Sequence, residues 1–548
     1  QNTYNSLLQF LIPLLTLSPT LLLFIYIYIY IYICFLSSKS EFYIKISRFH
    51  LSQNRKQMEI AVYKPYGDHE FQSLIERIHP PRVCIDNDTC RNCTIVKVDS
   101  ANKHGILLEM VQVLTDLDLL ILRSYICSDG GWLMDVFHVT DQLGNKITDE
   151  SLMHYIEQAI CASRKGSTEV QTCVGRNVRP RHVSMEHTAM EMTATDRPGL
   201  MSEISAVLAE LGCHVSGAVA WTHNKRAACI VYMEDDLKHG PIMDPYRVAQ
   251  IQAQLENVVE AHHYEGERRS VRLAAPAASQ THTERRLHQL MAADRDYEQC
   301  CSCGYDSSGD DVAHRQKKGS NSTEVKIENC KEKGYSIVTV RSMDRPKLLF
   351  DTICTLTDLQ YVVFHASISS FESIAFQEYY VRHKNGWTLD SESERRRMIQ
   401  NLMAATERRV SHELRLDVTT QNRVGLLADV TRVFRENGLS ISRTEVGVQG
   451  EQAVGTFYVK DTSGQAVTSE TLEIVRREIG GTVLVANKSS ERPSSQPTNL
   501  SNTSPSISTS TSSSSSNGKQ DNKPGFSLGS MFWSQLEWLS SNFRPIKS

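Results

Sequence analysis

The sequence carries little net charge and has no regular cysteine framework. Its 548 residues have a formal net charge of −4, which is small for this length and gives no global reason to expect nucleic acid as a partner. The 14 cysteines are spread thinly, which favours a reducing compartment over a disulfide-bonded secreted scaffold. A chain of this length is expected to form several domains.

Motifs of common catalytic sites are missing from the sequence. No glycine-rich phosphate loop separates an expected strand from a helix, and no Gly-x-Ser-x-Gly sequence occurs. The scattered histidines have no catalytic partner at a recognisable spacing, and we interpret them as strand or surface residues (His138, His182, His187, His262 and His263). The sequence therefore predicts no catalytic residues and no enzyme activity.

Two cysteine clusters have part of the spacing of a zinc site. Cys90 and Cys93 are three residues apart, and a second cluster spans residues 300–303. Neither cluster has a second ligand pair at the spacing of a zinc ribbon or finger. We predict no metal and no cofactor. The second cluster either responds to oxidants or consists of inert thiols.

Basic residues gather in two short runs, at 395–397 and 408–409, on an expected helix. We interpret both runs as part of a solvated helix face. RNA binding would require a strand motif with interleaved aromatic residues, and no such motif is present. The sequence thus predicts no nucleic-acid partner.

Residues 1–57 contain a long apolar run and precede the first methionine, Met58. Residues 25–33 alternate Ile and Tyr, as a translated ATATAT repeat would, so we interpret 1–57 as a translated leader that is not native. The rival interpretation is a membrane span, because residues 7–36 are long enough to cross ~30 Å of hydrocarbon. No basic region precedes the run, as a signal peptide would require. We expect a protein of the cytoplasm or nucleus and no membrane-spanning segment.

A pattern of strand, tight corner, helix and two strands occurs four times. In residues 192–235 an apolar run leads into an Asp-Arg-Pro-Gly corner that ends at Gly199. Apolar residues then recur at spacings of three and four, which predicts a helix, and two alternating runs predict strands. Units two and four match at an offset of 226 residues, so that Gly199 corresponds to Gly425. Units one and three match at an offset of 242, so that Leu114 corresponds to Leu356. The order A-B-A′-B′ indicates duplication of a two-unit module.

Repeats and composition divide the chain into successive segments. The expected boundaries are 58–91 for a lead-in, 92–175 for unit 1, 182–264 for unit 2, 265–324 for a polar linker with one helix at 283–297, 325–411 for unit 3, 412–488 for unit 4 and 489–548 for a Ser-rich tail. The composition of the tail predicts disorder, and its last residues regain apolar side chains. That apolar patch either docks on a partner or a membrane surface, or packs back on the four units.

Each unit is expected to form an α+β domain with the ferredoxin-like order βαββαβ, in which both helices cover one face of an antiparallel sheet. Exposed sheet edges invite pairing, so we expect the four units to pair into two side-by-side antiparallel sheets. The repeat order predicts that this pairing joins the adjacent units A and B of each module.

The Asp-Arg-Pro-Gly-Leu corner after a strand resembles the ligand corner of ACT domains. The four units resemble the plant ACT domain repeat family, together with the lead-in from Cys84 to Asn87 and the linker helix that starts at Thr283. This resemblance covers about residues 58–488. It implies small regulatory modules that bind amino acids at interfaces between paired units and catalyse nothing. It also allows a homodimer through ACT pairing and a protein partner bound through the linker or tail.

Glycine lets a ligand approach the backbone closely, and a helix that starts there directs free N–H groups and a positive dipole end at an amino-acid carboxylate. A neighbouring Asn or Asp could accept a hydrogen bond from the ammonium group. The candidate ligand residues are Asn102 with Gly105, Asp196 with Gly199, and Asn422 with Gly425. The alternative is that these residues only cap helices and turn the chain.

Units 1 and 3 depart from the corner pattern. Lys347 replaces the glycine in unit 3, and a long cation there should obstruct a zwitterion, so this unit is expected to be structural or to support an interface through Lys347. Unit 1 keeps Gly105 but lacks the Arg-Pro pair, so the resemblance supports ligand binding at its corner less strongly.

Three functions fit the sequence. The first is a non-catalytic amino-acid sensor, in which the ligand shifts the equilibrium between two states. The second is a regulatory subunit of a separate metabolic enzyme. The third is an interaction scaffold whose corners bind nothing.

Overall fold

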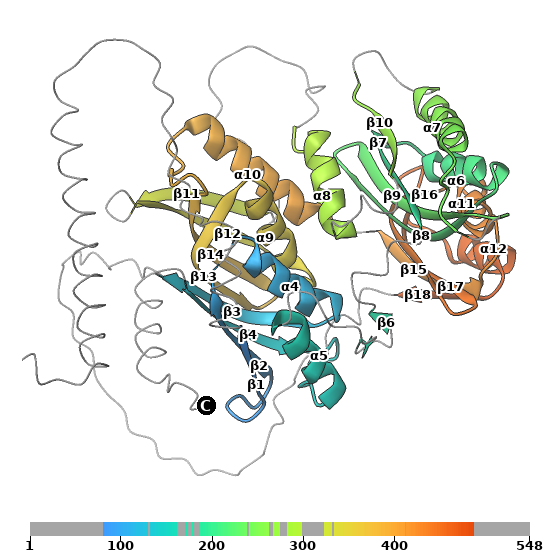
Figure 1. Cartoon of the computed structure of the whole chain (residues 1–548). Helices are drawn as coiled ribbons and strands as arrows, with labels where there is room; N and C mark the ends of the chain where they lie inside the picture. The colour runs from blue at the N-terminus through green and yellow to red at the C-terminus, as the bar shows by residue number, and fades with distance from the viewer. Residues whose placement is uncertain are drawn as a thin grey trace, which may run out of the picture. The chain divides into compact units, whose positions relative to one another are not determined.

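The computed structural model describes most of the four units (Figure 1). The described residues are 81–102, 104–129, 132–161, 170–172, 177–178, 187–237, 240–261, 267–274, 282–298, 323–330, 334–410 and 413–486. The chain divides into two compact parts, residues 1–66 and 67–548, and all of the described residues belong to the second part. The expected leader, the cysteine cluster at 300–303 and the tail from 489 lie outside the described residues. No described helix is long and apolar enough to cross a membrane.

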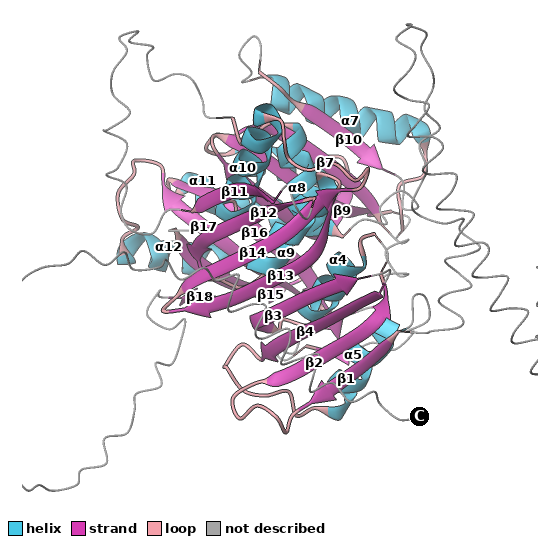
Figure 2. Ribbon diagram, turned by 90° about the vertical axis from the view of Figure 1, so that its left-hand side faces the viewer, coloured by secondary structure: helices cyan, strands magenta, loops and turns pink. Residues whose placement is uncertain are grey.

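Units 1 and 3 form one antiparallel sheet of eight strands, in the order β1-β2-β4-β3-β13-β14-β12-β11. Unit 1 consists of β1 (Arg82–Asp86), β2 (Thr94–Ala101), α4 (Ile106–Asp116), β3 (Leu120–Asp129), β4 (Trp132–Thr140) and α5 (Glu150–Cys161). Unit 3 consists of β11 (Glu324–Cys330), β12 (Tyr335–Met343), α9 (Leu348–Asp358), β13 (Tyr361–Phe371), β14 (Ile374–His383) and α10 (Glu392–Glu407). Figure 2 shows these strands side by side.

Units 2 and 4 form a second eight-stranded sheet, in the order β10-β7-β9-β8-β16-β17-β15-β18. Unit 2 consists of β7 (Thr188–Thr195), α6 (Leu200–Glu210), β8 (Cys213–His223), β9 (Arg226–Asp235), α7 (Pro245–Glu260) and β10 (Ser270–Ala274). Unit 4 consists of β15 (Leu414–Gln421), α11 (Leu426–Glu436), β16 (Leu439–Gln449), β17 (Gln452–Asp461), α12 (Ser469–Ile479) and β18 (Thr482–Ala486). The short strands β5 (Val170–Gln171) and β6 (Asn177–Val178) pair separately. The predicted α+β class with two side-by-side antiparallel sheets is confirmed.

The partners within each sheet are units 1 and 3, and units 2 and 4. The prediction that adjacent units A and B pair is wrong. Strand β3 pairs with β13 around Tyr125 and Ser367, and β8 pairs with β16 around Val219 and Glu445. Each of these residue pairs is separated by the repeat offset itself, so a pseudo-two-fold axis passes through the centre of each sheet. Two copies of one unit present equivalent edges, which can pair with each other about a two-fold axis.

The order of elements differs between the two kinds of unit. Units 2 and 4 follow the expected order βαββαβ, and their last strands, β10 and β18, pair with their first strands at the sheet edge. Units 1 and 3 follow the order ββαββα, because β1 and β11 precede the first central strand and occupy the same edge. An antiparallel neighbour can be joined by a short connection, so either end of the unit can supply this strand. Strand β10 lies within the range 265–324 that was expected to be linker.

The helices of each unit cover one face of its sheet (Figure 2). Buried apolar residues of α4 and α9 form one core with their strands, and those of α6 and α11 form another. Each of these four helices is followed by a residue with positive φ, where the chain turns back into a strand (Asp118, Gly212, Gln360 and Gly438). Helical spacing in the sequence therefore located both the buried face and the end of each helix.

Helix α8 (Thr283–Ala293) lies in the linker, where the sequence predicts a helix at 283–297. Its residues Leu287 and Met291 are fully buried and pack with Trp221 and Ile230, on strands β8 and β9 of unit 2. These strand residues alternate with the core residues that face α6, so α8 covers the opposite face of the unit 2 sheet. The apolar side of the linker helix is thus docked on the folded units.

Candidate functional site

The four expected corners share one backbone conformation. Gly105, Gly199, Lys347 and Gly425 each precede the first residue of a helix, with φ values of 89°, 82°, 63° and 75°. This left-handed conformation suits glycine, and it costs other residues roughly 1–2 kcal/mol. The first N–H groups of the helix lie directly beyond this residue and have no partner within the helix. In units 2, 3 and 4 the first of them donates to the carbonyl of the corner arginine, at 3.2–3.4 Å.

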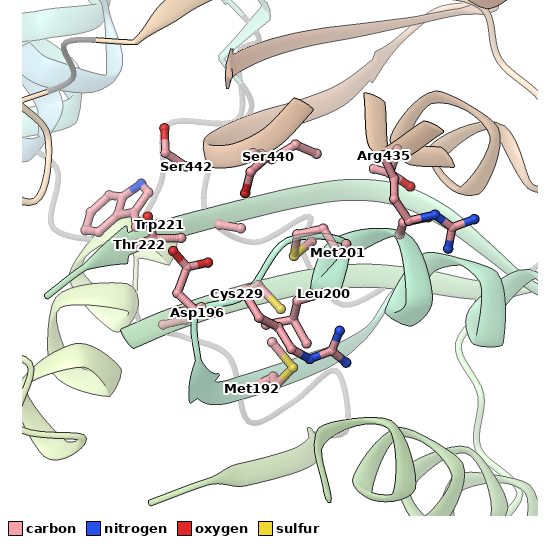
Figure 3. A pocket seen from close by; sticks show the side chains of 18 of the residues that line it. Met192, Asp196, Leu200, Met201, Trp221, Thr222, Cys229, Arg435, Ser440 and Ser442 are labelled. Atoms are coloured by element: carbon pink, nitrogen blue, oxygen red, sulfur yellow. The ribbon is translucent and has the colours of Figure 1, made fainter. Parts of the chain in front are cut away.

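A hollow lies at the corner of unit 2, between this unit and unit 4 (Figure 3). Asp196, Gly199 and the first turn of α6 line it from unit 2, and Arg435 and Ser440 line it from unit 4. In Figure 3 the side chains of Asp196 and Arg435 lie on opposite sides, with Ser440 between them. We refer to it below as the Gly199 hollow.

A second hollow lies at the corner of unit 4 and repeats this arrangement. Asn422, Gly425 and the first turn of α11 line it from unit 4, whereas Ala209 and Cys213 line it from unit 2. We refer to it as the Gly425 hollow. Two of the three predicted residue pairs, Asp196 with Gly199 and Asn422 with Gly425, therefore line hollows between paired units.

A hydrogen bond marks the axis that relates the two hollows. The hydroxyl groups of Ser205 on α6 and Thr431 on α11 are 3.2 Å apart and buried. The two residues occupy equivalent positions in their units, since they differ by the repeat offset of 226. Helices α6 and α11 thus pack about the pseudo-two-fold axis, and each brings its first turn to one hollow.

Both hollows are narrow in this structure. Their cavity volumes are about 20 Å³ and 30 Å³, which leaves room for one or two water molecules. A methyl group built on Gly199 would lie 3.1 Å from Cδ of Arg435, so this long side chain closes in on the corner. A ligand the size of an amino acid would require Arg435 to move, which an exposed, flexible side chain permits.

The Gly199 hollow contains groups of both charges. Burial raises the pKa of Asp196, while Lys460 lowers this pKa and Glu413 raises it further. A cationic partner would therefore stabilise the charged form of this half-buried carboxylate. Arg435 is exposed and forms no ion pair with another described residue. A carboxylate and a guanidinium group thus both line this hollow.

The Gly425 hollow has an amide, Asn422, where the Gly199 hollow has a carboxylate. The side-chain nitrogen of Asn422 lies 3.3 Å from Nε2 of His214 in unit 2. Asn422 is equivalent to Asp196, and His214, which contacts Asn422, is equivalent to Ser440, so the surroundings of the two corners differ at both positions. The two hollows accordingly provide different partners to any ligand.

The arginine of each corner is bound within its own unit. Arg197 donates to Glu203 at 2.8 Å, Arg345 lies 2.8 Å from Asp351, and Arg423 pairs with Asp429. The acidic residue lies in the first turn of the helix in each case. The same intra-unit pair thus recurs in three units, and Arg197 and Arg423 also line the two hollows.

The corner of unit 3 is closed by the linker helix. Lys347 donates to Glu284 of α8 at 2.8 Å, and the same carboxylate accepts two hydrogen bonds from Arg409, at 3.0 and 2.8 Å. Lys347 thus supports an interface, one of the two roles expected for it.

Arg408 and Arg409 are only 5% exposed, so the prediction that they form a solvated helix face is wrong. Arg408 donates to both oxygens of Asp296, and Arg409 binds Asp351 and lies 4.5 Å above the ring of Trp221. Buried charges of this kind are stable only as pairs, and their partners are far away in the sequence. We call the residues Glu284, His288, Asp296, Asp351, Arg408 and Arg409 the buried ionic cluster.

The corner of unit 1 has a different environment. Asn102 is half-buried, and a methyl group built on Gly105 would contact nothing within 4 Å. Burial lowers the pKa of the neighbouring His104, and so do the charges of Lys384 and Arg285. The pair Asn102 and Gly105 remains a prediction.

The sequence did not identify the residues that the partner unit contributes to each hollow. Arg435 and Ser440 line the Gly199 hollow from unit 4, whereas Ala209 lines the Gly425 hollow from unit 2. Because Arg435 is equivalent to Ala209, the repeat pattern contains no signal for it. Only the observed pairing of unit 2 with unit 4 reveals these residues.

Comparison with known proteins agrees with this architecture. Residues 89–167 match the ACR family N-terminal ACT domain, and residues 414–480 match the ACT domain. The chain is 51% identical over 496 residues to ACT domain-containing protein ACR1 of Arabidopsis thaliana, which covers 89% of this chain and 100% of that relative. It is 49% identical over 430 residues to ACT domain-containing protein ACR3 of Arabidopsis thaliana, which covers 77% and 91%.

A shorter likeness involves an enzyme. The bifunctional uridylyltransferase/uridylyl-removing enzyme of Azospirillum brasilense is 35% identical over 81 residues, which is 15% of this chain and 9% of the enzyme. The full-length likeness to the plant proteins is much more extensive. Together with the four units and their corners, it shows that the chain belongs to the ACR family of ACT domain-containing proteins.

Proposed function

We propose that this protein is a non-catalytic sensor that binds free amino acids in the Gly199 and Gly425 hollows. The observation that carries the proposal is the position of both hollows between paired units, each at the N-terminus of a helix. A ligand there contacts both units and is favoured by whichever arrangement of the two units fits it best.

The groups around the Gly199 hollow suit a zwitterion. The N–H groups at the start of α6 and the guanidinium of Arg435 would bind the carboxylate, and Asp196 would accept from the ammonium group. In the Gly425 hollow, the N–H groups at the start of α11 would bind the carboxylate, and the side-chain oxygen of Asn422, which carries no formal negative charge, would accept from the ammonium group. We therefore expect the Gly199 hollow to bind the more tightly of the two.

Thermal stability of the full chain, measured against each of the twenty amino acids, tests the proposal. A ligand bound only by the folded state at ~100 times its Kd stabilises the protein by about 2.7 kcal/mol. We expect one or a few amino acids to raise the melting temperature, and Gly199→Ala to reduce this shift because the added methyl group crowds Arg435.

Gly144→Ala is the matched control, because Gly144 lies outside both hollows. It introduces a methyl group at the same backbone conformation, with nothing within 4 Å. This variant should lose stability without losing the ligand-dependent shift. If none of the twenty amino acids stabilises the chain at millimolar concentration, the sensor proposal fails and the interaction scaffold is favoured.

A further inference from the structure

The loop between β1 and β2 holds two cysteines in a fixed arrangement. Asp86 at its start accepts hydrogen bonds from the backbone N–H groups of Asp88 and Thr89, at 3.0 and 2.9 Å. Asn87 donates to the carbonyl of Ile147 and accepts from the hydroxyl of Thr94, at 2.9 and 2.6 Å. The loop is thus held at both ends before any covalent link is formed.

The thiols of Cys90 and Cys93 lie next to each other in this loop. Their sulfur atoms are 3.0 Å apart, and both cysteines are free. Cys93 is only 4% exposed, whereas Cys90 is half-buried. One thiol is therefore accessible to solution, and the other is accessible mainly to its neighbour. A nucleophilic thiol and a resolving thiol have this arrangement.

The electrostatic environment separates the two thiols. Hydrogen bonds from the Cys93 thiol and from the backbone N–H of Asn92 lower the pKa of Cys90, and the charge of Lys146 contributes in the same direction. Burial raises the pKa of Cys93 to about 11, and so does the neighbouring Cys90. The accessible thiol is consequently the one that forms a thiolate more easily, and the thiolate is the reactive form.

The fold does not require this pair. In unit 3 the equivalent loop keeps the hydrogen bonds of Asn87 and Thr94, since Ser336 donates to Asn329 and Asn329 donates to the carbonyl of Leu389. The position equivalent to Cys93 is Tyr335, so unit 3 has no such pair. No group of three or more metal-ligating side chains occurs among the described residues, which disfavours a zinc site here.

We propose that Cys90 and Cys93 are a reversible redox site that exchanges with small-molecule disulfides of the glutathione class. The Cys90 thiolate attacks one sulfur of the small disulfide, forms a mixed disulfide and releases one thiolate, which takes up a proton. Cys93 then loses its proton to solvent and attacks the sulfur of Cys90. This step forms the Cys90–Cys93 disulfide and releases the second small thiol. One dithiol and one disulfide thus become one disulfide and two thiols.

Peptide mapping of the full chain tests the proposal directly. Arg91 lies between the two cysteines, so trypsin separates residues 83–91 from residues 92–97. After equilibration with oxidised glutathione and alkylation of the remaining thiols, we expect these two peptides to be linked and two alkylated thiols to be lost. Dithiothreitol should restore two separate, alkylated peptides.

Three variants distinguish the proposal from other cysteine chemistry. Cys84→Ser is the matched control, because Cys84 lies on the same tryptic peptide as Cys90, and it should leave the link intact. Cys93→Ser should abolish the link and leave Cys90 as a mixed disulfide with glutathione. Lys146→Met should slow the alkylation of Cys90 in the reduced protein.

Two outcomes would overturn the proposal. The first is that the two wild-type peptides remain unlinked after exposure to excess oxidised glutathione, and that Cys90 is then alkylated, which shows that its thiol stayed reduced. The second is a link that depends on Cys84. The wild-type result alone decides the matter if Cys93→Ser does not fold. Because the mapping involves no amino-acid ligand, its outcome is independent of the sensor proposal.

Discussion

At the scale of single residues, equivalent positions in the four units have taken on different roles. Gly199 and Gly425 leave space at a helix N-terminus, whereas Lys347 occupies the same conformation and extends to Glu284. Asp196 and Asn422 are likewise equivalent but differ in charge. Three of the four equivalent corners thus keep glycine, and the fourth is closed by an ion pair.

The charge of Asp196 predicts that ligand binding depends on pH. The pKa of this carboxyl is raised by burial, so it takes up a proton at a higher pH than an exposed Asp does. A protonated Asp196 cannot pair with an ammonium group, and the affinity of the Gly199 hollow should therefore fall on acidification. Titration calorimetry between pH 7 and pH 4 would measure this fall. Asp196→Asn should bind more weakly at pH 7 and depend little on pH.

Substitution of Lys347 separates backbone strain from ion pairing. Lys347→Met removes one charged partner of Glu284 and should destabilise the chain by about 1.5–3 kcal/mol. Lys347→Gly removes the same partner but relieves the left-handed conformation, so it should be about 1 kcal/mol more stable than the Met variant. Urea unfolding of the two variants gives the comparison. Equal stabilities would show that the backbone at this position is not strained.

At the scale of elements, helix α8 joins units that do not share a sheet. Its apolar side packs on β8 and β9 of unit 2, and its polar side reaches α9 and the end of α10 in unit 3 through the buried ionic cluster. Arg408 donates to Nδ1 of His288, so Nε2 of this histidine carries the proton that it donates to Asp351. Burial lowers the pKa of His288, in agreement with this neutral form.

Loss of Arg409 should be among the most damaging single changes at this contact. Arg409→Met leaves Glu284 and Asp351 buried with fewer cationic partners, and breaking a buried pair costs about 3–5 kcal/mol. Arg396→Met, on the preceding helix α10, is the matched control, because its ion pair with Glu392 is exposed. The control should change the free energy of unfolding by less than about 0.5 kcal/mol. Similar effects of both substitutions on denaturant unfolding would contradict the buried role of Arg409.

The ionic cluster also predicts a loss of stability in acid. Hydrogen bonds and charges from Arg408 hold the pKa of Asp296 well below its usual range, against the opposing effect of burial, and Arg409 does the same for Asp351. The unfolded chain therefore binds more protons than the folded chain once the pH falls toward ~4, the usual pKa of Asp. The stabilisation is fully present above that pH and is lost below it. The urea concentration at the midpoint of unfolding, measured at pH 7, 5 and 4, should decrease between pH 5 and pH 4. The decrease should be smaller in Arg409→Met. An unchanged midpoint at pH 4 would contradict the prediction.

Much of the fold could be predicted because the repeat itself carries the pattern. Apolar spacing located α6 and the linker helix α8, and the corner glycines marked the helix starts. The pairing of units could not be predicted. The sequence of a single edge strand does not show whether it pairs with the adjacent unit or with the equivalent unit of the other module. For the same reason Arg435 and Ser440 were not recognised as part of the Gly199 hollow, and Arg409 was placed in solvent.

At the scale of the whole molecule, both sheets are built from the two halves of the chain. Units 1 and 2 lie in the first half, and each forms its central strand pairing with a unit in the second half. Neither half therefore contains a complete sheet. The interlaced order A-B-A′-B′ makes each half depend on the other.

Division of the chain tests this dependence. A fragment of residues 81–298 would expose the edges of β3 and β8, and because these edges pair with equivalent copies of themselves, it should form dimers. Addition of residues 323–486 should replace the dimers with a complex of one copy of each fragment. Size-exclusion chromatography with light scattering measures both states. A first fragment that stays monomeric at micromolar concentration would count against this account of the pairing.

The long separation of paired strands also has a consequence for the nascent chain. Tyr125 and Ser367 face each other in the sheet but are 242 residues apart. At a translation rate of about 5–20 residues per second, the edge of β3 emerges roughly 12–50 s before its partner has been made. During that interval two ribosomes on one message could bring together identical edges from different copies. Throughout that interval the first half exposes a strand edge that is free to pair with an identical copy.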